Sequence, residues 1–218
     1  MNSRTLNKNS SSSGKRKFKF LLFVFTFFIT NLLSFSINAS ANENLSDVQA
    51  GKIRTGLKIF RSLLLADRDI EKKVNEEQAV DIIFLFQSNN SKAKHFAKTF
   101  VRMGRRSSVG LIKGNPIKVH VMRKLSLIKG TNIRPAAIFI IDPLIESRVK
   151  AIAEYGRNKK IITFSPFEGD VENGILGGLV VDSRILPFIN KNTLTASEVR
   201  IKPFFLKVAR TYESNDIK

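Results

Sequence analysis

The pattern of apolar and polar positions switches between two periods along this chain. Apolar residues recur at helical spacing from residue 53 to residue 64, and Ser46 with Gln49 forms a capping box ahead of them. Short runs rich in branched and aromatic residues follow at Val80–Phe86, Pro135–Ile141 and Lys160–Phe164. These runs predict buried strands, because they are short and hold the residue types that strands favour.

Helical spacing returns between the predicted strands. The segment Ala93–Val101 places apolar residues on one face and predicts a helix that ends at Gly104. A second helix is expected from Pro143 to Gly156, with Asp142 as its N-cap, because Asp followed by Pro is typical of a helix start.

The remaining segments predict a half-exposed strand and a different C-terminal part. Apolar and polar residues alternate over Ile117–Met122. Two apolar runs around Asp182–Arg184 predict a β-hairpin, and Pro187 places the second strand at an edge or a bulge because proline cannot donate to a ladder. A closing helix is expected over Lys202–Tyr212, with three apolar residues buried: Phe204, Phe205 and Val208.

Strands that alternate with helices favour a parallel sheet covered on both faces. The fold class that we expect is therefore α/β: a single three-layer domain with a mainly parallel sheet, a C-terminal β-hairpin and a closing helix. This domain would occupy residues 42–218.

The first 41 residues carry a different pattern. A basic opening leads into the apolar stretch Phe20–Ile37, and the small-residue sequence Asn38–Ala41 follows it. This order predicts a secretion signal peptide over residues 1–41, removed after export to the periplasm. The alternative is a retained anchor in the inner membrane, because the apolar stretch is just long enough to span a bilayer.

Composition narrows the classes of partner. The formal net charge is +19, and the excess of positive charge persists beyond the first 41 residues. For an exported protein this excludes nucleic acid as the expected partner and leaves open a membrane surface met by a basic face, or a merely solvated basic surface. The chain has no cysteine, so it forms no disulfide and no thiolate metal site, and we expect no cofactor.

Four polar residues follow predicted strands of the sheet: Ser88, Asn90, Asp142 and Ser165. The carboxyl ends of parallel strands share one edge, where helix N-termini favour anions. These residues therefore predict a crevice for a small anionic ligand, although helix capping explains Asn90 and Asp142 equally well.

Two charged groups are expected to contact a partner protein. One is the acidic loop with Glu168 and Asp170, and the other is the basic end of the predicted helix, with Arg102, Arg105 and Arg106. The sequence shows no nucleophile motif, and His95 and His120 are expected to be ordinary, partly exposed residues and not catalytic bases. A non-enzymatic role is expected, and a hydrolase acting through Glu168 ranks last.

Four stretches near the C-terminus carry a family resemblance: Ile161–Ser165, Gly177–Val181, Ile185–Asn190 and Ile201–Ala209. With the export signal, they resemble the YfiR-like family of periplasmic proteins. The chain departs from that family in having no tryptophan in its first helix and no cysteine for family disulfides.

The resemblance implies a compact α/β domain that often self-associates. It also implies a regulator that holds a membrane-bound diguanylate cyclase inactive and thereby controls cyclic-di-GMP. The first function hypothesis is therefore a periplasmic regulator acting on the outer part of an inner-membrane signalling protein, with homo-oligomerisation left open. The alternative is a periplasmic module that binds a small anionic ligand.

Overall fold

The computed structural model describes residues 47–214. Contacts within the chain separate residues 1–49 from a unit formed by residues 50–218, and the following description concerns that unit. The predicted signal peptide, its cleavage site and the capping residue Ser46 lie outside the described residues. No helix in the described range is both long and apolar enough to cross a bilayer.

The unit begins with a helix over residues 50–66, here called the N-terminal helix. The longer elements follow in this order: β1 (Val80–Leu85), α2 (Asn90–Val101), β2 (Leu111–Ile112), β3 (Asn115–Met122), β4 (Ala137–Ile140), α3 (Glu146–Lys159), β5 (Ile162–Ser165), β6 (Gly177–Val181), β7 (Ile185–Asn190), α4 (Lys191–Ala196), α5 (Pro203–Val208) and β8 (Arg210–Tyr212). Three short 3₁₀ turns lie between them: η1 (Ile70–Lys72), η2 (Arg106–Ser108) and η3 (Leu125–Ile128).

The strands form one sheet of eight in the order β2-β3-β1-β4-β5-β6-β7-β8. The five central strands, from β3 to β6, are mutually parallel, whereas β2 and β7 run antiparallel to their neighbours β3 and β6. Strand β1 pairs with β3 on one side and with β4, which follows later in the chain, on the other side. The strand order therefore reverses between β1 and β4, and a ligand crevice is expected at such a point.

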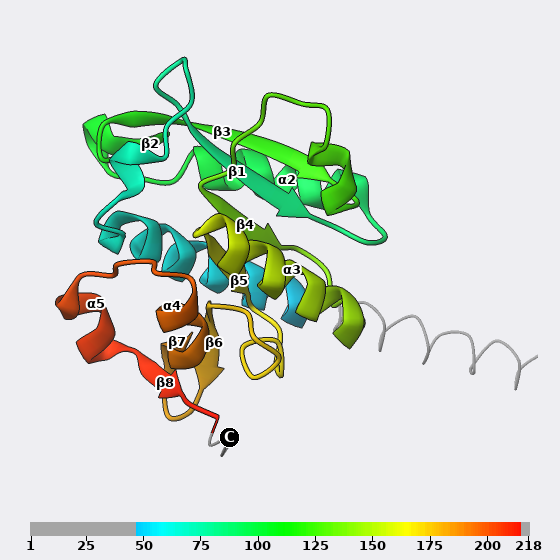
Figure 1. The fold of residues 1–218 in the computed structure, drawn as a ribbon, viewed down its shortest axis with the longest axis vertical. Helices are drawn as coiled ribbons and strands as arrows, with labels where there is room; N and C mark the ends of the chain where they lie inside the picture. Colours follow the sequence, from blue (N-terminus) through cyan, green and yellow to red (C-terminus); the bar gives the residue numbers. More distant parts are fainter. Residues whose placement is uncertain (1–46, 215–218) are drawn as a thin grey trace, which may run out of the picture. The chain divides into compact units, whose positions relative to one another are not determined.

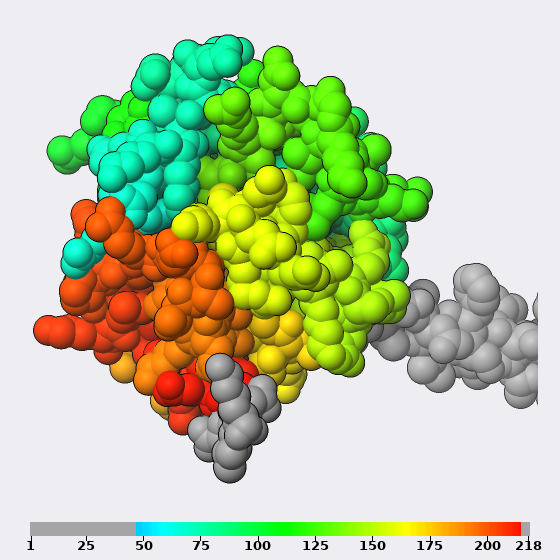
Figure 2. Space-filling model, in the orientation of Figure 1, coloured from blue at the N-terminus to red at the C-terminus, as the bar shows by residue number. Residues whose placement is uncertain are grey.

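Helices cover both faces of the sheet (Figure 1), and a cluster of buried apolar residues lies on each face. On one face the N-terminal helix and α2 pack on a phenylalanine cluster: Phe60, Phe84, Phe100, Phe139 and Phe164. On the other face α3 packs on Ile83, Leu85 and Ile138. Figure 2 shows α3 and α4 side by side on this second face. The predicted α/β class, its three layers, the C-terminal hairpin and a closing helix are confirmed.

The boundaries of α3 differ from the prediction. The helix begins at Glu146, and Ile145 stands at the N-cap without a side-chain hydrogen bond. Asp142 does not cap it, because its carboxylate is bonded elsewhere. Gly156 lies inside the helix, which continues to Lys159 and ends where Lys160 adopts the left-handed conformation, with φ of 55°.

The C-terminal part also differs. The chain leaves α5 at Val208 and forms β8, which pairs with β7 from Phe188 onward. Phe205 is buried as predicted, but Phe204 and Val208 are 60% and 59% exposed because they lie one helical turn apart on the outer side of a short helix. The prediction that Pro187 lies in an edge strand is wrong: β7 lies inside the sheet, and Pro187 precedes the residues that β8 pairs.

The start of β6 tolerates only glycine, because it lies against the end of β5. A β-carbon at Gly178 would lie 2.7 Å from the carbonyl oxygen of Ser165 and 2.6 Å from the Val171 side chain. Both distances are too short for any side chain, and one of the two atoms belongs to the backbone, which cannot rotate away. Gly178 therefore allows β6 to approach β5 and the loop that joins them.

Replacing Gly178 by alanine is expected to lower the free energy of unfolding by about 1–3 kcal/mol, the usual cost of overpacking a core. The matched control is Gly51→Ala in the N-terminal helix, where a β-carbon would meet no atom within 4 Å. That substitution should raise stability by about 0.5–1 kcal/mol through helix propensity. Urea unfolding of both variants checks this, and equal effects would contradict the close approach of β6 to β5.

Candidate functional site

The crevice expected between β1 and β4 is bridged by one carboxylate. Asp142, directly after β4, accepts hydrogen bonds from the backbone N–H groups of Gln87 and Ser88 at 2.9 and 3.1 Å. The Ser88 hydroxyl donates to the same oxygen at 3.3 Å, and the Lys92 ammonium lies 3.9 Å from the other. The donors that could hold an anion at this point are therefore bonded to a residue of the chain itself.

The structure brings only two of the four predicted ligand residues together. Ser88 contacts Asp142, whereas Asn90 is exposed at the first residue of α2. Ser165, at the end of β5, is fully buried, and its hydroxyl donates to Asp170 at 2.5 Å. Ligand binding by these residues stays a prediction, and the observed bonds give Ser88, Asp142 and Ser165 structural roles.

Polar side chains hold the segment from residue 166 to residue 176, which links β5 to β6 without a helix. The Asn190 amide donates to the Val171 carbonyl at 2.7 Å, and the Thr193 hydroxyl donates to the Gly174 carbonyl at 2.9 Å. The Thr163 hydroxyl accepts the Leu176 N–H at 3.0 Å. The segment is thereby fixed at three points along its length, although it has no regular hydrogen-bonding pattern of its own.

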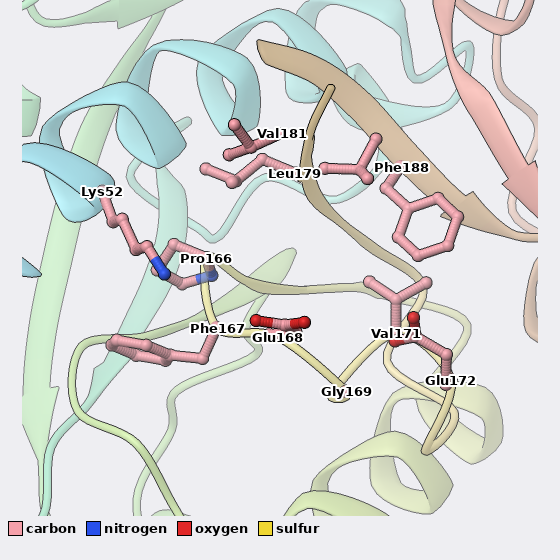
Figure 3. A pocket seen from close by; sticks show the side chains of 11 residues that line it. Lys52, Pro166, Phe167, Glu168, Gly169, Val171, Glu172, Leu179, Val181 and Phe188 are labelled. Carbon is pink, nitrogen blue, oxygen red and sulfur yellow. The ribbon is translucent and has the colours of Figure 1, made fainter. Parts of the chain in front are cut away.

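A hollow of about 210 Å³ opens between this segment and the β6–β7 hairpin, and we call it the carboxyl-edge hollow. Apolar side chains form part of its walls, from Phe167, Val171, Leu179 and Phe188, and polar groups form the rest. Figure 3 shows Leu179 and Phe188 across the hollow from the loop that bears Phe167 and Glu168. Because the hairpin is in the sheet and the loop is bonded to it, both walls are held in place before any ligand arrives.

Charged groups of both signs stand at the hollow. Glu168 and Glu172 are exposed on the loop, and Lys52 extends from the N-terminal helix towards it (Figure 3). Such an arrangement can bind a small molecule with an apolar body and an ammonium or carboxylate group. The sequence analysis singled out the acidic residues, but it missed Lys52 and Phe188, which only the folded chain brings to the loop.

The residues expected to contact a partner divide into two sets. Glu168 is exposed on its loop, as a contact residue requires, and Arg102, Arg105 and Arg106 are exposed beyond the end of α2. Asp170 is only 7% exposed and is bonded to Ser165, so it is not on the surface. The prediction that Asp170 forms a contact patch is therefore wrong: burial takes it out of reach of a partner.

The half-buried His120 forms a polar pair with the buried Asp81 that the sequence analysis missed. Its Nε2 lies 2.7 Å from Oδ1 of Asp81, which is 2% exposed and also accepts from the Asn75 amide at 3.0 Å. An aspartate inside the otherwise apolar run Val80–Phe86 was the signal that could have revealed it. Among the described residues no hydroxyl is bonded to His120, so the pair orders the strands without forming a triad.

The described residues contain no group of three or more histidine, aspartate or glutamate side chains arranged to hold a metal ion. In the acidic loop, Asp170 is buried whereas Glu168 and Glu172 are exposed, so these three carboxylates do not converge on one point.

Comparison with known proteins yields weak structural likeness only. No protein-family model and no curated protein matches the chain. Two similar solved structures are an ABC domain in complex with L-Trp from Streptococcus pneumonia (15% identity, TM-score 0.46) and a conserved domain protein from Vibrio cholerae (14%, 0.45). A third is a ligand-free, open substrate-binding protein with adhesive properties from Clostridium difficile (13%, 0.44).

The matches cover 68%, 66% and 63% of this chain. They cover 61%, 57% and 56% of the other chains, so this chain spans well under two thirds of the length of each structure. The class of protein defined by the chain's own topology is a three-layer α/β domain with a small hollow at the carboxyl edge of its sheet.

Burial of Asp170 gives a testable pH dependence. Desolvation raises the pKa of this carboxyl above its ordinary value, Glu172 adds to the rise, and the Ser165 hydroxyl opposes it. A raised folded-state pKa means that the folded protein binds more protons than the unfolded chain between the two pKa values. Stability should therefore fall as pH rises from the ordinary pKa near 3.8 through the raised value.

The variant Asp170→Asn removes this titration while keeping an oxygen for Ser165. Urea midpoints measured from pH 4 to pH 7 should show the wild type losing stability relative to the variant as pH rises. The matched control is Asp182→Asn, at an exposed residue of the hairpin turn. A constant difference between wild type and Asp170→Asn across this range would show that Asp170 is not the titrating group.

Proposed function

We propose that this chain is a non-enzymatic regulatory protein of the YfiR-like family, exported to the periplasm, which takes a small ligand in the carboxyl-edge hollow. The observation that carries the proposal is the hollow itself: apolar walls with Lys52 on one side and Glu168 and Glu172 on the other. A zwitterion with an apolar side group, such as an amino acid, matches this combination of apolar, positive and negative groups.

The residues of the family resemblance support the proposal because they build this hollow. Gly178 allows β6 to reach β5, and Asn190 both caps α4, by accepting the Thr193 N–H at 2.8 Å, and fixes the loop at Val171. The shared motif is thus a scaffold for the site. The motif supports a related architecture, and the identity of the ligand depends on the residues that line the hollow.

A ligand panel tests the site, using protein purified in the form that its own cells produce. Amino acids, amines and carboxylic acids are screened by thermal shift, and the affinity of each hit is measured by calorimetry. Glu168→Gln should weaken binding of an ammonium-bearing hit at least about tenfold, because hydrogen bonds to charged groups contribute about 1.5–3 kcal/mol.

The matched control is Glu154→Gln, which removes an exposed carboxylate of α3 and should leave affinity unchanged. A panel without hits, or equal loss in both variants, would remove the hollow as the binding site.

A second surface favours contact with a partner protein. Leu186 and Val208 line a hollow of about 620 Å³ together with three cations: Arg184, Lys207 and Arg210. Strand β8 is the last strand of the sheet as described, so its outer edge can pair with another chain. We propose that this β7–α5 surface binds the outer part of an inner-membrane signalling protein, such as a diguanylate cyclase, and that ligand in the carboxyl-edge hollow shifts its affinity.

Cyclic-di-GMP levels in the native cell test the regulatory role. Deleting the gene should raise them, and the wild-type gene should restore them. Val208→Glu should fail to restore them, because it places a carboxylate on the proposed contact surface. The matched control Val109→Glu changes a valine of similar exposure, 47% against 59%, and should restore them. Unchanged cyclic-di-GMP after deletion would rule out regulation of a cyclase.

A further inference from the structure

Arg61 is a buried cation that forms no ion pair within residues 47–214, the part of the chain that the structure describes. It lies in the N-terminal helix, is 8% exposed, and donates from Nη2 to the carbonyl oxygens of Ser108 and Leu111 at 2.9 and 2.6 Å. Its other terminal nitrogen, Nη1, is buried without a hydrogen-bond partner among the described residues. Desolvation lowers the pKa of this guanidinium, as expected where no carboxylate offsets its charge.

Three further cations surround Arg61. It lines a solvent-open hollow of about 1020 Å³, here called the Arg61 pocket, with Lys58, Arg105 and Lys113. The pocket walls also bear the side chains of Ser62, Ser107 and Ser108, and none of the residues that line it is acidic. Lys113 is paired with Glu71 outside the lining, and the positive charges of the pocket repel one another, so a bound anion would stabilise the arrangement.

Three separate segments hold these charges in place. Lys58 and Arg61 are one turn apart on the N-terminal helix, where like charges are unfavourable without a counter-ion. Arg105 lies four residues beyond the end of α2 at Val101. Lys113 occupies the β2–β3 turn with φ of 46°, and its ammonium donates to the Asp67 carbonyl at 2.8 Å, with Glu71 at 3.6 Å. Glu71, which does not line the pocket, is the one carboxylate recorded in an ion pair with any of these cations among the described residues.

We propose that the Arg61 pocket binds a phosphate group, with the guanidinium of Arg61 at its base and Lys58, Arg105 and Lys113 around it. A dianionic oxyanion suits four converging cations better than a single carboxylate does. Nη1 is closed off from solvent, so Arg61 acts on the anion through its charge, whereas the exposed side chains of Lys58 and Arg105 can donate hydrogen bonds to it directly. This site uses none of the residues of the carboxyl-edge hollow and does not depend on the proposed function.

Thermal unfolding with inorganic phosphate is the first test. At constant ionic strength, phosphate at about a hundredfold excess over its dissociation constant should raise the wild-type Tm by about 5 °C or more. Chloride at the same ionic strength should leave the Tm unchanged. An equal rise of the Tm with chloride would overturn the proposal. So would a Tm that does not rise with up to 10 mM phosphate, if the vesicles described below also fail to bind.

Variants locate the effect without disturbing the fold. Arg61→Met should abolish the shift, but it also removes the bonds to Ser108 and Leu111. The double variant Lys58→Gln/Arg105→Gln changes only exposed side chains and should weaken phosphate binding at least about tenfold. The control Arg54→Gln/Lys94→Gln removes the same charge from exposed sites that do not line the pocket. An equal loss of phosphate affinity in both double variants would show that phosphate responds to overall charge, and it would overturn the proposal.

Vesicles distinguish a lipid headgroup from free phosphate as the source of this group. Phosphatidylcholine vesicles containing phosphatidic acid are sedimented with the wild type and with both double variants. Binding lost only in Lys58→Gln/Arg105→Gln supports the pocket with a lipid phosphate. A Tm shift with free phosphate but no sedimentation supports the pocket with a soluble ligand. Vesicle binding retained in that variant, without a phosphate shift in the wild type, would overturn the proposal.

Discussion

The helix-free connection from β5 to β6 is the feature on which the candidate site depends. A connection between parallel strands normally carries a helix that satisfies its own backbone groups. Here backbone groups of residues 166–176 bond to one another in turns and to side chains of the flanking elements, through Thr163, Asn190 and Thr193. The connection therefore stays thin at the carboxyl edge and leaves room for a hollow, where a helix would have covered the strand ends.

The same constraint explains why polar residues are buried near the site. Ser165 and Asp170 bond to each other inside the loop, and Asn190 at the end of β7 ties the hairpin to it. A buried polar group that loses its partner costs roughly 1–3 kcal/mol, so these residues specify one loop conformation. Glu168, which lines the carboxyl-edge hollow, is thereby presented on a backbone that is held by bonds within the chain.

Positive charge is arranged unevenly over the unit. At the carboxyl-edge hollow, Lys52 is matched by Glu168 and Glu172, which favours a ligand with little net charge. At the Arg61 pocket, four cations converge with no carboxylate in the lining. The two places therefore favour ligands of different chemistry.

Much of the architecture could be predicted because its signals are local. The apolar run Val80–Phe86 and the helical spacing over Ala93–Val101 each reflect neighbours within a few residues, so both elements are where the sequence placed them. The end of α3 was missed because Gly156 resembles a helix stop, although its lack of a side chain serves packing against Thr163. Strand β8 was missed because its pairing partner, β7, lies about twenty residues earlier in the chain.

The candidate sites show the same division. The acidic loop and the basic residues after α2 are visible in the sequence as charged runs, and so is the α/β class through the alternation of strands with helices. Only the tertiary structure decided that Asp142 bonds to the loop after β1, that Asp170 is buried, and that Arg61 lies beside Arg105 and Lys113. Periodicity along a chain indicates which face of an element is apolar. The partners of a buried charge are residues distant in the sequence, and only folding brings them within a few ångströms of it.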